Sequence, residues 1–95
     1  MSKDDFIEAE RIKLLDERRK DWAESGVDID ERFGPGSFGC HEAMHVADIL
    51  AGLIENQLCN HSAVLRDPRW FKLATEARDS LGRLYQEIGA VHLDD

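Results

Sequence analysis

Residues 38–50 read FGCHEAMHVADIL, and together with residues 51–58 they form the segment that decides the fold. At 100° per residue, its apolar side chains gather on one broad arc of a helix. The arc contains Cys40, Ala43, Met44, Val46, Ala47, Leu50, Ala51, Leu53, Ile54 and Leu58. A narrow polar stripe lies opposite and contains His41, His45, Asp48, Gly52, Glu55 and Cys59. So wide an arc suits a helix that packs against more than one neighbour.

A second helix with a cleaner apolar face follows and is expected to pack against the first. Asp67 and Pro68 are typical of an N-cap and a first helical position, and Gly89 is expected to end the helix. The connecting loop is short, which favours an antiparallel hairpin. The expected order is helix 2–25, connector 26–36, helix 37–59, loop 60–66, helix 67–89 and tail 90–95.

The amino-terminal helix, residues 2–25, has only a thin, interrupted apolar stripe. Ser2 and Asp5 resemble a capping box, and Gly26 is a suitable stop. Because its apolar stripe is weak, we expect this helix either to cover the hairpin or to reach a neighbouring subunit. Nothing in the chain alternates with period two, so the sequence predicts an all-α fold of three helices.

Length and charge restrict the function classes. A chain of 95 residues forms one domain with a modest core, so we expect a homo-oligomer. The net charge of −8 argues against non-specific nucleic-acid binding, which depends on neutralising phosphates. No apolar run is long enough to span a membrane, and the charged start does not resemble a signal peptide. The two cysteines are expected to be free thiols, which fits a cytoplasmic protein.

A glycine-rich turn before residue 38 is the first candidate site. Backbone N–H groups at a helix start can hold an anion, phenylalanine rings can stack on a base, and arginines can meet a phosphate. The candidate residues are Arg32, Phe33, Gly36, Ser37, Phe38 and Gly39, with Arg18, Arg19 and Lys20 reaching in from another helix or subunit. The alternative is a tight interhelical turn in which the phenylalanines staple the helix start.

The segment His41-Glu42-Ala43-Met44-His45 matches the H-E-x-x-H pattern of zinc metalloproteases. Two histidines four residues apart on a helix can hold one zinc ion, and Asp48 shares their stripe. A hydrolase also needs a third ligand, for which the sequence offers His61, Glu76 and His92 without a defining motif. We therefore do not expect an enzyme, and the alternative is a solvated polar stripe.

A further pattern combines Arg32-Phe33, His41, the run from Leu53 to Cys59 and a second Leu/Ala-rich helix from Leu73 to Ile88. In this layout the chain resembles small phage anti-defence proteins that sequester nucleotide immune signals. The resemblance implies a non-enzymatic oligomer that binds a small nucleotide-like ligand, and it adds His41 to the ligand-binding candidates. The two alternatives are a metal-binding helical protein that uses residues 41–45, and an adaptor or inhibitor that acts through protein contacts.

Overall fold

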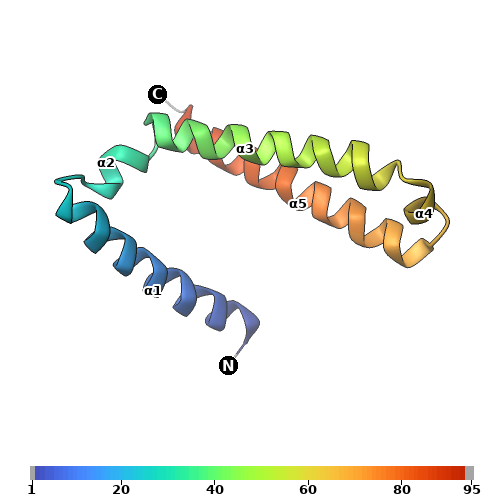
Figure 1. Ribbon diagram of the computed structural model, residues 1–95, viewed down its shortest axis with the longest axis horizontal. Coiled ribbons are helices and arrows are strands. Elements are labelled where there is room, and N and C mark those ends of the chain that lie inside the picture. The colour runs from blue at the N-terminus through green and yellow to red at the C-terminus, as the bar shows by residue number, and fades with distance from the viewer. Residues whose placement is uncertain (1, 94–95) are drawn as a thin grey trace.

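The structure is a computed structural model that describes residues 2–93, and every regular element in that range is helical (Figure 1). The three long helices are α1 (Lys3–Glu24), α3 (Phe38–Ile54) and α5 (Pro68–His92). Two short helices, α2 (Ile29–Phe33) and α4 (Ser62–Leu65), and a π-helical turn, η1 (Glu55–Cys59), complete the chain. The prediction of an all-α fold is confirmed. The prediction of three helices accounts for the three long helices but not for α2 and α4.

Helices α3 and α5 form an antiparallel hairpin, and η1 and α4 close its far end (Figure 1). Gly89 lies inside α5, where a Cβ atom on it would be 3.5 Å from the Met44 sulfur. The prediction that Gly89 ends this helix was therefore wrong, since α5 continues to His92. A glycine costs a helix only about 1 kcal/mol, which packing against α3 offsets. Of the predicted tail, residues 94–95 lie outside the described part of the chain.

The long helices begin where their capping residues predict. The Ser37 hydroxyl accepts a hydrogen bond from the backbone N–H of Cys40 at 3.1 Å. The Asp67 carboxylate accepts from the N–H groups of Arg69 and Trp70 at 2.9 and 3.1 Å. Each of these bonds satisfies an amide that has no partner inside its helix. The capping box at the start of α1 is also present, because Ser2 and Asp5 exchange hydrogen bonds at 3.2 Å.

The two predicted connectors each contain a helix too short to produce a sequence period. In residues 26–36, Gly26 and Gly36 adopt φ values of 73° and 86° on either side of α2. This left-handed backbone is strained for other residues and lets the chain turn sharply before and after α2. In residues 60–66, the His61 ring caps α4 by accepting a hydrogen bond from the Ala63 N–H at 3.1 Å.

Helix α1 forms an arm separate from the hairpin (Figure 1). Within residues 2–93 it contacts α2 but neither α3 nor α5, so the expectation that it covers the hairpin is not met in the single chain. The radius of gyration is 16.9 Å, whereas a compact chain of this length has about 12 Å. In the described part of the chain the arm is attached only through the α1–α2 corner, and this corner carries the candidate site.

Few residues of the described chain are buried. The buried apolar residues in this range are Met44, Ala47 and Cys59. Large side chains on all three long helices remain exposed, so the single chain leaves much of its apolar surface in contact with water. Among the described helices, none has both the length and the apolar composition needed to cross a membrane.

Candidate ligand-binding site

An aromatic cluster holds α1, α2 and the start of α3 together. The Phe33 ring lies against the Trp22 ring, with 5.4 Å between the ring centroids. The ring also packs onto Gly39, which is buried in the first turn of α3. A Cβ atom on Gly39 would lie 2.9 Å from the Arg32 carbonyl oxygen, closer than real Cβ atoms approach. Phe33 and Gly39, both predicted as ligand contacts, therefore belong to the packing of the corner.

Two arginines complete this corner. The Arg19 guanidinium donates two hydrogen bonds to the Asp30 carboxylate, at 3.1 and 3.2 Å, which ties α1 to α2. The hydrogen bond with Asp30 raises the pKa of Arg19, and the nearby Asp30 charge adds to this effect. Arg32 lies with its guanidinium carbon 6.0 Å from the centre of the Trp22 ring, within the range of a cation–π contact. Arg19 is thus engaged, while Arg32 presents its guanidinium at the surface.

The backbone amides of the glycine-rich turn are mostly hydrogen-bonded. The Gly36 N–H donates to the Nδ1 atom of His92 at 2.8 Å, and the Ser37 N–H donates to the Gly34 carbonyl at 3.0 Å. The imidazole ring of His41 lies beside His92, with 5.5 Å between centroids. These bonds hold the turn against the end of α5. With the Ser37 cap, these bonds engage the N–H groups of Gly36, Ser37 and Cys40. An anion-binding turn would need such N–H groups to be free.

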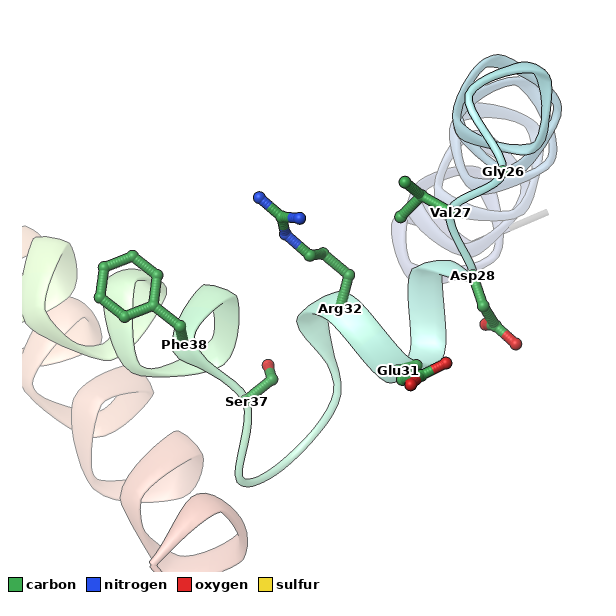
Figure 2. A pocket seen from close by; sticks show the side chains of 7 residues that line it. All are labelled: Gly26, Val27, Asp28, Glu31, Arg32, Ser37 and Phe38. Carbon is green, nitrogen blue, oxygen red and sulfur yellow. The ribbon is translucent and has the colours of Figure 1, made fainter.

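A hollow of about 480 Å³ lies beside α2 (Figure 2). It is lined by Gly26, Val27, Asp28, Glu31, Arg32, Ser37 and Phe38. The side chains of Val27, Arg32 and Phe38 extend to the same side of α2 in Figure 2, whereas the carboxylates of Asp28 and Glu31 extend away from the guanidinium. Phe38 is 77% exposed, which is unusual for a residue with so large an apolar side chain.

The structure brings together three of the predicted ligand contacts, Arg32, Ser37 and Phe38. Arg18 and Lys20 do not line this hollow: Arg18 borders a separate one on α1, and Lys20 is exposed on α1. Gly26, Val27, Asp28 and Glu31 also line the hollow but were not predicted; they reach it because of the turn at Gly26 and the α2 helix. The Asp28 N-cap, whose carboxylate accepts from the Asp30 N–H at 2.9 Å, was the available signal for that helix.

The metal interpretation gains no geometric support. His41, His45 and Asp48 are all exposed on α3. Across residues 2–93, no group of three or more histidine, cysteine or acidic side chains is placed to hold a metal ion. Two of the possible third ligands are already engaged, because the Nδ1 atoms of His61 and His92 both accept backbone hydrogen bonds.

No protein-family model, curated protein or solved structure matches this chain. The resemblance to phage anti-defence proteins therefore stays a prediction, and function has to be inferred from the site itself.

Proposed function

We propose that this protein is a small binding protein that sequesters an anionic, nucleotide-like molecule in the hollow beside α2. The observation that carries the proposal is the convergence of a cation, a hydroxyl group and an exposed ring on one surface. Arg32 comes from α2, whereas Ser37 and Phe38 come from the start of α3. The volume of about 480 Å³ lies within the usual range of small-molecule sites.

Each of the three side chains has a distinct role in this proposal. The guanidinium of Arg32 offers two parallel N–H donors, the geometry that matches two phosphate oxygens. The Ser37 oxygen already accepts the Cys40 amide, which leaves its O–H free to donate to the ligand. The exposed Phe38 ring provides a stacking face for a base, an interaction worth about 1–3 kcal/mol in single-stranded nucleic-acid binding.

The acidic residues beside the hollow restrict the charge of the ligand. Asp28 and Glu31 line it together with a single arginine, Arg32. Their carboxylates would repel a polyphosphate, whereas one guanidinium suffices for a phosphodiester with one negative charge. We therefore propose a cyclic mononucleotide, or a cyclic dinucleotide that places one of its two phosphodiesters at Arg32, rather than a nucleoside triphosphate as the ligand class. We also propose a homo-oligomer, because the described chain buries too little apolar surface to be stable alone. We propose a cytoplasmic location because Cys40 and Cys59 are both free thiols.

Isothermal titration of the full chain with cyclic mononucleotides, cyclic dinucleotides, ADP-ribose and ATP tests the proposal. The wild-type protein should bind one cyclic nucleotide per hollow and should bind ATP more weakly. Arg32→Ala and Phe38→Ala should each weaken binding by about tenfold or more. Arg66→Ala, which removes the same charge beside α4 at the far end of the hairpin, should bind like the wild type. Absence of heat with every nucleotide, or equal binding by all four proteins, would contradict the proposal.

A further inference from the structure

The exposed apolar surface of the hairpin is too large for a single folded chain. The accessible surface is 7615 Å², whereas a folded monomer of 10.8 kDa is expected to expose about 5,500 Å². The separate α1 arm accounts for part of the difference. The hairpin contributes as well, because large apolar residues of α3 and α5 stay roughly half exposed. The position of these residues on the two helices shows which side of the hairpin is uncovered.

One flank of the hairpin is polar. A hollow of about 450 Å³ runs along it, lined on α3 by residues that include Asp48, Gly52 and Glu55. On α5 the lining includes Arg78 and Arg83, and Arg78 forms an ion pair with Glu55 at 3.6 Å. These positions fix which way each helix is rotated about its axis. On each helix, one edge of the face that contacts the other helix borders the polar flank. The residues at the other edge of that face form the opposite flank.

That opposite flank is apolar on both helices. Six side chains form it, all between 43% and 58% exposed: Val46, Leu50 and Leu53 of α3, and Leu73, Leu84 and Val91 of α5. Ala47 is buried between the two helices, while Ala43 and Ala77 are exposed and fall next to that contact at 100° per residue. We call this surface the apolar flank. The small alanines lie near the line where the two helices meet, and the six large side chains lie farther out on each helix. Together they form a shallow, uncharged surface along the hairpin.

We propose that the apolar flank is covered by the same flank of a second copy of this chain, which gives a four-helix bundle with twofold symmetry. Residues 2–93 bury only three apolar residues, so the folded chain needs a partner, and a second copy of the chain is present wherever the protein is made. Two identical flanks without charged side chains can meet despite the net charge of −8, which resides on other surfaces. A standard interface buries about 800 Å² on each partner, which is within the excess surface of the chain.

The twofold arrangement follows from two features of the flank: it is made of two helices, and it is apolar throughout. Each hairpin contributes two helices, and packing two such pairs side by side gives the helix–helix contacts of a four-helix bundle. In a twofold interface both copies use the same surface patch, so each residue of the patch contacts residues of the same patch on the other copy. A patch that is apolar throughout is therefore complementary to itself. The candidate ligand hollow lies outside the apolar flank, at the α1–α2–α3 corner. The dimer is thus independent of the proposed ligand.

Sedimentation equilibrium of the full chain tests this proposal. The wild-type protein should have twice the chain mass of 10.8 kDa, and its thermal midpoint should rise with chain concentration. Leu50→Glu places an uncompensated charge in the interface and should raise the dimer dissociation constant by about 100-fold or more. Gln86→Glu adds the same charge on the polar flank and should remain dimeric.

Three results would overturn the proposal. The first is a wild-type monomer whose thermal midpoint does not depend on concentration. The second is a Leu50→Glu protein with the same assembly mass and midpoint as Gln86→Glu. The third is dissociation caused by Gln86→Glu alone. The concentration dependence of the wild type decides the question even if Leu50→Glu does not fold.

Discussion

The Phe33 ring lies directly against Gly39, across the junction between α2 and α3. Gly39 is buried, and the absence of its side chain makes room for both the ring and the Arg32 carbonyl. The contact orients α2 so that Arg32 and Phe38 border the same hollow (Figure 2). The position of the candidate site therefore depends on one missing methyl group.

Gly39→Ala should destabilise the protein although alanine is the better helix former. The added Cβ atom would overlap the ring of Phe33, and overpacking of this kind typically costs about 1–3 kcal/mol. Gly52→Ala is the matched control, because a Cβ atom there meets nothing within 4 Å. It should stabilise α3 by about 0.5–1 kcal/mol. Urea unfolding at one fixed chain concentration measures both changes, and equal effects of the two variants would refute the Phe33–Gly39 contact.

His92→Ala should loosen the turn at Gly36. The His92 Nδ1 atom accepts the Gly36 N–H at 2.8 Å, and losing a hydrogen bond of this kind costs about 0.5–1.5 kcal/mol. Hydrogen exchange at the Gly36 amide should accelerate by about threefold to tenfold. His61→Ala, at the opposite end of the hairpin, serves as the control. Unchanged exchange at Gly36 in His92→Ala would show that this bond does not hold the turn.

The Glu8–Arg11 pair predicts a pH dependence in α1. The hydrogen bond from Arg11 lowers the pKa of Glu8 below its ordinary value of 4.5. The stabilisation is therefore fully present above pH 4.5 and is lost as pH falls through the lowered pKa. Carboxyl chemical shifts of Glu8 recorded against pH should show the lowered midpoint, and Arg11→Ala should return it to about 4.5. Lys13→Ala removes an equal charge from α1 and should leave the Glu8 midpoint low; a return to 4.5 there would contradict the specific pairing.

Local signals in the sequence were sufficient to predict where the long helices start. Ser37, Asp67 and the pair of Ser2 and Asp5 mark helix starts, because capping depends on residues only two or three positions apart. The end of α5 was predicted wrongly at Gly89, because glycine is common at helix ends but also occurs inside a helix where a neighbour packs closely, as Met44 does here. Only the neighbouring helix distinguishes these two uses.

Cys59 shows how a local change in helix type defeats a regular wheel. At 100° per residue it falls in the polar stripe with His41 and His45, yet it is 6% exposed and buried. The π-helical turn over Glu55–Cys59 has more residues per turn, which rotates the end of this segment relative to α3. The types of residues 55–59 give no signal for a π-helical turn, so the burial of Cys59 could not be predicted from the sequence.

The candidate site was predictable in part. The types of Arg32, Ser37 and Phe38 and their distance from a helix start indicated binding, and these residues do share one hollow. Phe33 and Gly39 have the same local pattern but pack against each other, and Phe33 also packs against Trp22. The difference arises from α1, whose contact with α2 is a tertiary feature that no spacing within residues 32–39 encodes.

The most direct test of the proposed function is a map of backbone amide shifts by NMR while a cyclic dinucleotide is titrated into the full chain. We predict saturable shifts concentrated at residues 26–38, with Arg32, Ser37 and Phe38 among the largest, and small shifts along the apolar flank. Shifts that do not saturate, or saturable shifts confined to the apolar flank and absent at Arg32 and Phe38, would contradict a ligand site beside α2.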